Sequence, residues 1–125
     1  MASRAVTGVY DRHLRAIGLQ ASQLAVLWAV AGLRRAAIKD MAQTIAMNET
    51  ALLRNLRVLE RQGWVVIDVG QDRRQRLVSL TSAGREVFSE ALPLWKKAQD
   101  EITAVLDGSV KEINRQLLRL TRAVT

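Results

Sequence analysis

The sequence contains no cysteine and only one histidine, His13, among its 125 residues. The absence of cysteine excludes disulfide bonds, thiolate metal ligands and redox sensing through a thiol. A catalytic zinc site usually takes two or three nitrogen ligands, so one histidine argues against a metalloenzyme. There is also no glycine-rich phosphate loop and no gathered set of catalytic side chains. We therefore expect neither an enzyme nor a bound cofactor.

Long hydrophobic runs are missing as well. No apolar stretch approaches the roughly 20 residues that a helix needs to span a bilayer. The first residues lack the continuous apolar segment of a secretory signal. We therefore expect a cytoplasmic protein with no membrane partner. Its 125 residues are the length of one ordinary domain.

Acidic residues are too few to balance the basic ones, which leaves a net charge of +7. The excess is uneven along the chain. Residues 34–76 hold nine arginines and lysines against five acidic residues, whereas residues 77–125 hold seven against six. A basic excess favours an anionic partner. The acidic residues near the end of the chain, Glu86, Glu90, Asp100 and Glu101, are predicted to form a solvated helix face.

Apolar residues repeat with a helical period in four segments of the first half of the chain. These segments are residues 5–17, 21–31, 38–46 and 49 to about 62. Gly18, Gly32 and Gly63 are expected to end the first, second and fourth helices. A turn at Ala46 precedes the fourth helix, and Asn48 is a suitable N-cap for it.

The apolar period then changes from 3.6 to 2. Residues 64–69 and 76–80 predict two strands, and the polar residues 70–75 between them predict a turn. Two strands with a short polar connection form a hairpin. A helix-turn-helix followed directly by such a hairpin is the winged-helix arrangement, so the fold class is mainly α with a small β-hairpin wing.

The last part of the chain predicts two more helices whose apolar residues alternate at spacings of three and four. The first covers about residues 82–106, and Pro93 inside it is expected to kink or split it. Gly108 is expected to separate it from the final helix, where Ser109 and Glu112 match a capping box. Such heptad seams favour packing against a second copy, although packing within one chain remains an alternative.

Arginines line one face of the helix over residues 49 to about 62. Arg54, Arg57 and Arg61 are spaced three and four residues apart, away from the leucine stripe. The planar guanidinium fork suits phosphate oxygens and the guanine edge. Because the N-terminal residues of such a helix come nearest the base edges, Thr50 and Arg54 are the best candidates for base contacts. The alternative is an ordinary surface helix on which one arginine pairs with Glu60.

The predicted hairpin tip adds a second basic element, with Arg73, Arg74 and Arg76 close together. Clustered like charges repel and do not help folding, but they suit a minor groove or a line of phosphates. Asp72 is expected to pair with Arg74 and order the loop, which leaves Arg73 or Arg76 free. The complete set of predicted contacts to double-stranded DNA is Lys39, Asn48, Glu49, Thr50, Ala51, Arg54, Arg57, Arg73, Arg74 and Arg76.

Two segments resemble the MarR family of transcriptional regulators. Residues 56–65 are similar to the family's L-x-x-L-E-x-x-G-hydrophobic end of the recognition helix. Residues 72–84 are similar to its wing signature, D-x-R followed by a strand and L-T-x-x-G. The similarity covers about residues 14–106. It implies one MarR-like domain over residues 1–125.

Within that domain the resemblance implies a winged helix-turn-helix DNA-binding lobe over 20–81 and a helical dimerisation region over 1–18 and 82–125. It further implies a homodimer, most simply a repressor, modulated by a small effector that is often an apolar acid. The short chain before the first helix predicts less N-terminal wrapping of the dimer. The missing cysteines exclude the peroxide-sensing branch of the family.

Tyr10, His13 and Trp28 are candidates for the effector pocket, with His13 or Arg15 meeting a carboxylate. The alternative is that these side chains pack in the core or the interface. Ala51 and Leu53 depart from the family, which often has serine or threonine there. This departure leaves open a second function, a regulator-like protein-interaction module, or antagonist, with weak DNA binding.

Overall fold

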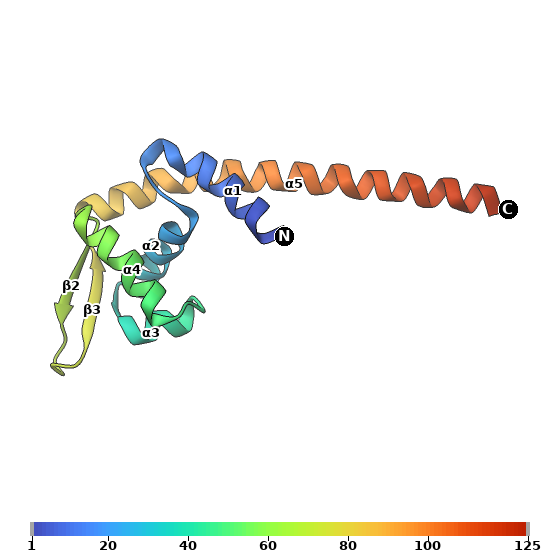
Figure 1. Cartoon of the computed structure of the whole chain (residues 1–125). Helices are drawn as coiled ribbons and strands as arrows, with labels where there is room; N and C mark the ends of the chain where they lie inside the picture. The colour runs from blue at the N-terminus through green and yellow to red at the C-terminus, as the bar shows by residue number, and fades with distance from the viewer. Residues whose placement is uncertain (1, 125) are drawn as a thin grey trace.

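The computed structural model describes residues 2–124, which form five α-helices, one short 3-10 helix and three strands (Figure 1). In chain order these are α1 Ala2–Leu14, η1 Arg15–Ile17, α2 Ala21–Leu33, β1 Arg35–Ala37, α3 Ile38–Thr44, α4 Glu49–Arg61, β2 Val65–Val69, β3 Arg76–Leu80 and α5 Ser82–Val124. The predicted class, mainly α with a β wing and a winged-helix arrangement, is confirmed.

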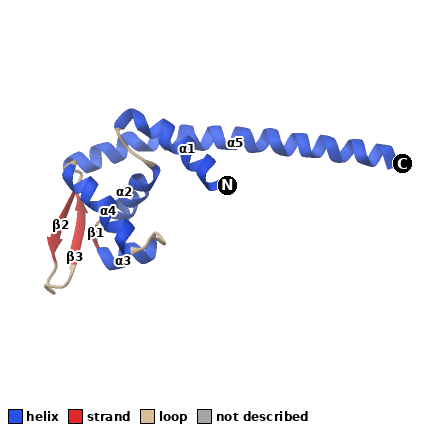
Figure 2. Ribbon diagram, viewed as in Figure 1, coloured by secondary structure: helices blue, strands red, loops and turns tan. Residues whose placement is uncertain are grey.

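The sheet has three strands in the order β1-β3-β2, and both pairings are antiparallel. The hairpin of β2 and β3 was predicted, but β1 was not. Ala36 of β1 lies opposite Val78 of β3, and both side chains are buried. Three residues are too few to show a strand period, so this pairing was not visible in the sequence. Figure 2 places the strands at the end of the lobe away from the C-terminus.

One apolar core holds the lobe together, and α2 contributes to it more buried residues than any other helix. The leucine stripe of α4, Leu52, Leu56 and Leu59, is fully buried in it. The remaining buried members are Leu14, Leu19, Leu24, Val26, Leu27, Val30, Ala36, Met41, Val65, Val78, Val87 and Ala91. Because α4 is fixed by this stripe, its opposite face is held outward.

Left-handed backbone ends two helices where the sequence predicted it. Gly18 and Gly63 have φ of 74° and 78°, a conformation that costs glycine little. Gly32, by contrast, does not end α2: the helix continues through Leu33, and Arg34 takes the positive φ of 65°. The helix end predicted at Gly32 thus came two residues too early, since a glycine inside a helix costs only about 1 kcal/mol.

Residues 82–124 form a single helix, so the predicted breaks at Pro93 and Gly108 were wrong. Proline leaves the carbonyl four residues earlier without a donor. That residue is Ser89, which is exposed together with Pro93, so water can take the place of the missing donor. A glycine costs a helix only about 1 kcal/mol, so Gly108 alone does not end this long helix. Ser109 and Glu112 therefore lie inside the helix rather than capping it.

Thr81 joins the end of α4 to the start of α5. Its hydroxyl donates to the carbonyl of Gly63 and accepts from the amide of Gly84 at 3.0 Å. Its own amide donates to the carbonyl of Trp64 at 3.1 Å. The L-T-x-x-G signature is thus the junction between the winged-helix part of the chain and the long helix.

The second half of α5 projects away from the rest of the molecule (Figure 1). Every residue from Thr103 to Leu120 is exposed. None of the helices between residues 2 and 124 is by itself long and apolar enough to cross a membrane. The segments Arg4–Ile17 and Ala21–Leu33 reach that length and composition only as a pair bent by 75°.

Candidate nucleic-acid interface

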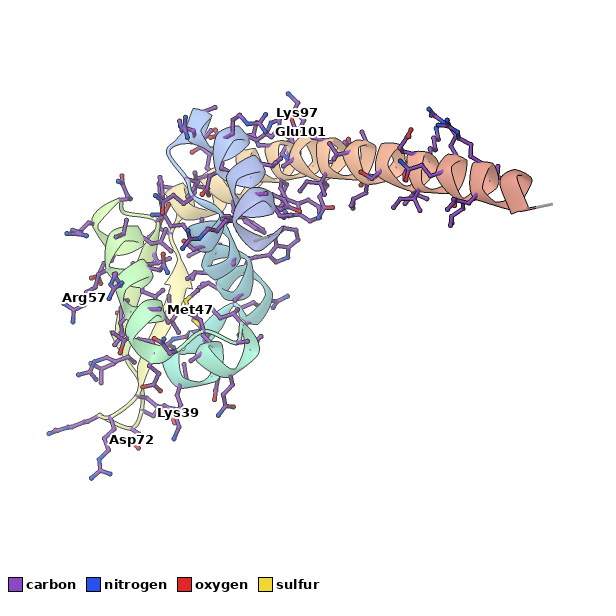
Figure 3. The ribbon with its side chains drawn as sticks, turned by 45° about the vertical axis from the view of Figure 1, so that its right-hand side comes forward. Lys39, Met47, Arg57, Asp72, Lys97 and Glu101 are labelled. Carbon is purple, nitrogen blue, oxygen red and sulfur yellow. The ribbon has the colours of Figure 1, made fainter. Side chains whose placement is uncertain are left out.

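The outward face of α4 carries the arginines that the sequence placed there. Leu52, Leu56 and Leu59 have no exposed surface, whereas Arg54 and Arg57 are exposed. Arg57 points away from the body of the molecule in Figure 3. None of the ion pairs found in residues 2–124 involves an arginine of α4, so the alternative pairing with Glu60 is not formed. These guanidinium groups are available to an external anion.

The first turn of α4 presents the predicted base-reading positions. Asn48 caps the helix, because its side-chain oxygen accepts from the amide of Ala51 at 2.8 Å. Glu49 and Thr50 are exposed beside it, and Ala51 is half-buried. Asn48 is thus occupied by the cap, while Thr50 is free to reach a base edge. Leu53 is 36% exposed on the same helix and makes part of this surface apolar.

Asn55 holds α4 in place and was missed by the sequence analysis. Its side-chain amide donates to the carbonyl of Ala51 at 3.2 Å and to the sulfur of Met47 at 3.7 Å. Its oxygen accepts from the hydroxyl of Ser22 on α2 at 3.4 Å. The available signal was an asparagine inside a helix, where it is unfavourable unless its side chain has a specific partner.

The wing turn between β2 and β3 is closed by backbone hydrogen bonds. The amide of Gly70 donates to the carbonyl of Gln75 at 3.0 Å, and that of Gln75 donates to the carbonyl of Asp72 at 2.9 Å. The Asp72 carboxylate accepts from the backbone amide of Arg74 at 3.0 Å, rather than from its guanidinium as predicted. A carboxylate two residues before an amide can close an Asx turn with little strain, which explains the difference.

The three wing arginines differ in how they are used. Arg76 folds back, and its Nη1 donates to the carbonyls of Arg73 and Gln75 at 2.9 and 3.3 Å. Arg73 and Arg74 are exposed, and their guanidinium groups have no partner within the described part of the chain. The wing therefore presents two cations to the solvent, while the third one stabilises the turn.

A groove of about 480 Å³ brings Lys39, the start of α4 and the base of the wing together. Lys39 lies at the start of α3, and Figure 3 shows it near Asp72 at the same end of the lobe. The groove is lined by Ala37, Ile38, Lys39, Glu49, Leu53, Asp72, Arg74, Gln75 and Arg76. The tertiary structure thus brings together, along one surface, residues from three separate segments that were predicted to contact DNA.

The predicted effector residues do not share one site. Tyr10 and Trp28 line an apolar cavity of about 570 Å³ together with Trp95 of α5. The indole rings of Trp28 and Trp95 meet edge to face, with centroids 5.1 Å apart. Among the described residues, no charged side chain lines this cavity. His13 does not line this cavity, and Arg15 lines a different, smaller one.

His13 instead belongs to an ionic contact between α1 and α5. The guanidinium of Arg12 donates two hydrogen bonds to the carboxylate of Glu101, at 2.9 and 2.7 Å. These bonds, with the positive charge of Arg12, lower the pKa of Glu101. Nε2 of His13 lies 3.6 Å from Glu101 and is buried without a hydrogen bond in the described residues. Glu101 was predicted to be merely solvated, and its partner on α1 lies 89 residues away.

Comparison with known proteins agrees with this geometry. A family model described as a winged helix DNA-binding domain matches residues 23–97. The chain is 25% identical over 118 residues to YwoH of Bacillus subtilis, an uncharacterized HTH-type transcriptional regulator, and the match covers 94% of this chain and 86% of YwoH.

Two solved structures show the same fold. The M. tuberculosis transcriptional regulator MosR, crystallised in complex with DNA, superposes with a TM-score of 0.78 and 32% identity, covering 99% of this chain and 92% of that one. Wild-type MarR from E. coli gives a TM-score of 0.69 at 20% identity, covering 89% and 90% of the two chains. The matched regulators confirm the prediction that this chain is not an enzyme.

Proposed function

The chain belongs to the MarR family of winged helix transcriptional regulators, and from this we propose that it acts as a homodimeric repressor whose hold on DNA is modulated by a small ligand. Its family is one of DNA-binding regulators. Because such a protein acts on DNA, we propose that it is located in the cytoplasm. The proposal divides the chain into a DNA-binding lobe over 20–81 and a dimerisation region over 1–18 and 82–125.

One observation carries the DNA-binding part of the proposal: Arg54 and Arg57 on α4 and Arg73 and Arg74 on the wing are exposed cations without ion-pair partners in the described chain. We assign Thr50 and Arg54 to base edges, because the first turns of a recognition helix lie nearest the floor of the major groove. Arg57 and Lys39 are assigned to phosphates.

The dimer part is supported by the apolar stripe on the projecting half of α5. Val110, Ile113, Leu117 and Leu120 follow at spacings of three and four and are each more than half exposed. In an isolated chain this apolar stripe would be in contact with water. Packing it against a second copy would take its apolar surface out of water, which is favourable. Two lobes would then read half-sites about 34 Å apart.

The ligand part rests on the 570 Å³ cavity lined by Tyr10, Trp28 and Trp95. It lies between α1 and α5 of the dimerisation region and α2 of the lobe, so a ligand in it can favour one spacing of the lobes over another. Release from DNA follows when the favoured spacing no longer matches successive major grooves.

The decisive experiment selects bound sequences from random duplex DNA and then measures affinity for the winning site. We expect a pseudo-palindromic site and a log affinity that falls linearly with log salt. Arg54→Ala is expected to weaken binding by about 1–3 kcal/mol and to relax the preference at one position in each half-site. Absence of any enriched sequence, with weak binding even at low salt, would contradict the proposal and favour a protein-interaction module.

A further inference from the structure

Leu53 is an apolar side chain in the middle of the charged surface that the proposed function assigns to DNA. It is 36% exposed, whereas Leu52 and Leu56 on the same helix are fully buried. It lies one turn after Glu49 and one turn before Arg57, and both of these are exposed. A single exposed leucine is ordinary on a protein surface. This leucine requires an explanation because charged residues surround it.

Leu53 lines the groove of about 480 Å³ between the start of α4 and the base of the wing. Ala37 and Ile38 line the same groove, so its wall contains a small apolar area. The remaining lining residues are charged or polar, namely Lys39, Glu49, Asp72, Arg74, Gln75 and Arg76. Figure 3 shows Lys39 and Asp72 at this end of the lobe. The apolar area thus lies inside a charged surface rather than in a continuous apolar patch.

The cations around this groove indicate nucleic acid, rather than a protein, as its occupant. Arg54, Arg57 and Arg74 are exposed and form no ion pair within the described chain. Protein interfaces exclude charged residues from their apolar centre, whereas here Arg57 stands one turn from Leu53. Duplex DNA supplies the negative charge that these guanidinium groups lack.

The same groove contains two neighbouring side chains that are unsuited to a phosphate. Leu53 has no hydrogen-bonding group, and the carboxylate of Glu49 repels a phosphate. Glu49 forms no ion pair between residues 2 and 124, so no neighbouring cation neutralises it directly. The first turns of a recognition helix also lie nearest the base edges. The part of α4 that carries both residues therefore faces bases rather than the sugar–phosphate backbone.

We propose that Leu53 contacts the C5-methyl group of a thymine in the major groove and so selects a T·A base pair at one position of each half-site. The thymine methyl is the only apolar group among the base edges of the major groove, and the minor groove has none. Leu53 has no donor or acceptor, so it reads a base edge through this methyl. The proposal rests on the proposed DNA-binding function and adds to it a specificity residue without charge.

Selection by a single methyl group needs a helix that is held firmly, and α4 is held at both sides of Leu53. The side chain of Asn48 caps the helix, accepting from the amide of Ala51 at 2.8 Å. The side chain of Asn55 accepts from the hydroxyl of Ser22 on α2 at 3.4 Å. The buried leucines of α4 fix its rotation about its own axis. The height of Leu53 above the base edges is therefore set by the fold.

The test replaces thymine by uracil, one symmetric position at a time, in the DNA site that the whole protein selects from random duplexes. Uracil keeps the hydrogen-bonding groups of thymine and lacks only the methyl group, so a change in affinity reports that methyl. At one position we expect binding to weaken about 4-fold when one half-site is changed and about 15-fold when both are changed, from the transfer free energy of one buried carbon.

Two protein variants assign this effect to a residue. Leu53→Ala removes the contacting atoms and retains a good helix former. In this variant the uracil exchange at the same position is expected to change affinity by less than about 2-fold. Leu92→Ala is the matched control, because Leu92 is also 36% exposed and lies on α5 outside the groove. It should keep the full uracil effect. Each ratio is taken within one protein, so a difference in the active fraction cancels.

The outcomes separate this proposal from the DNA-binding function. If the selected site holds no thymine, or if no uracil exchange weakens binding by the wild type, the methyl contact does not exist, although DNA binding stands. If Leu53→Ala keeps the full uracil effect, another side chain reads the thymine and the assignment to Leu53 is wrong. Absence of any selected sequence contradicts the DNA-binding function and this proposal together.

Discussion

At the scale of single residues, Gly84 shows how closely α5 approaches the end of α4. A Cβ added to Gly84 would overlap the backbone carbonyl of Trp64, which is itself fixed by the amide of Thr81. Neither partner is a flexible side chain, so neither can move aside. The glycine of the L-T-x-x-G signature is therefore required by packing.

We predict that Gly84→Ala lowers the free energy of unfolding by about 1–3 kcal/mol, the usual cost of overpacking. Urea denaturation measures it. The matched control is Gly108→Ala in the same helix, where an added Cβ meets nothing within 4 Å. That variant should gain about 0.5–1 kcal/mol, because alanine is the better helix former. Similar effects of the two variants would contradict the packing explanation.

The pair of Arg12 and Glu101 makes a pH-dependent prediction. Because the folded protein lowers the pKa of Glu101 from its ordinary 4.5, the folded state binds fewer protons than the unfolded state. The stabilisation is thus complete above this ordinary value and is lost as the pH falls through the lowered pKa. Glu101→Gln should be less stable than the wild type at neutral pH, and this difference should vanish in acid.

Thermal unfolding of both proteins from about pH 7 down to about pH 3 measures this difference. Glu90→Gln, on the same helix, is the control, since its carboxylate makes no ion pair within residues 2–124. A difference between Glu101→Gln and the wild type that stays constant over the whole pH range would show that the ion pair does not stabilise the fold.

At the scale of elements, the three wing arginines differ in their surroundings. Arg76 is tied to the turn, whereas Arg73 and Arg74 are exposed. Asp72 closes the turn through the amide of Arg74, so its charge neutralises neither guanidinium by direct pairing. The wing is therefore expected to act on DNA mainly through charge.

We predict that replacing Arg73 and Arg74 together by alanine weakens DNA binding and reduces the slope of log affinity against log salt by about 2 for each bound lobe, and so by about 4 for the proposed homodimer, since each phosphate contact contributes about 0.9. Electrophoretic mobility shifts at several salt concentrations measure the slope. Arg119→Ala, an equally exposed arginine on the projecting half of α5, should leave it unchanged. An unchanged slope in the double variant would show that Arg73 and Arg74 do not contact DNA phosphates.

At the scale of the whole molecule, α5 extends far beyond the lobe that it supports. Its exposed apolar stripe is continuous with a small apolar cavity between α1 and α5, lined by Val6, Val9, Ile102 and Val105. In the proposed homodimer, the two helices would offer one surface to the second copy. Such a dimer would double the number of DNA contacts, so affinity would depend on assembly.

We predict that Ile113→Glu shifts the protein from dimer to monomer and weakens its binding to a two-half-site DNA at least tenfold, because a charge placed in the seam cannot be buried without a partner. Sedimentation velocity measures the mass. Arg119→Glu is the control, since it places the same carboxylate on the opposite, polar face. A dimeric Ile113→Glu protein would contradict the role assigned to the projecting helix.

The sequence by itself determined the elements whose cause is local. The 3.6 and 2 periods marked α4 and the wing strands, Asn48 marked the cap, and Gly18 and Gly63 marked the helix ends. It also placed Arg54 and Arg57 opposite the buried leucines, since that follows from helix geometry alone. These features depend on residues a few positions apart.

Only the tertiary structure decided what depends on residues far apart in the chain. The strand β1 exists because β3 offers it an edge. Arg12 meets Glu101 across 89 residues, and Lys39 joins the wing in one groove. Such contacts form when the core closes, and no local pattern encodes them, because their energy comes from partners that folding brings together.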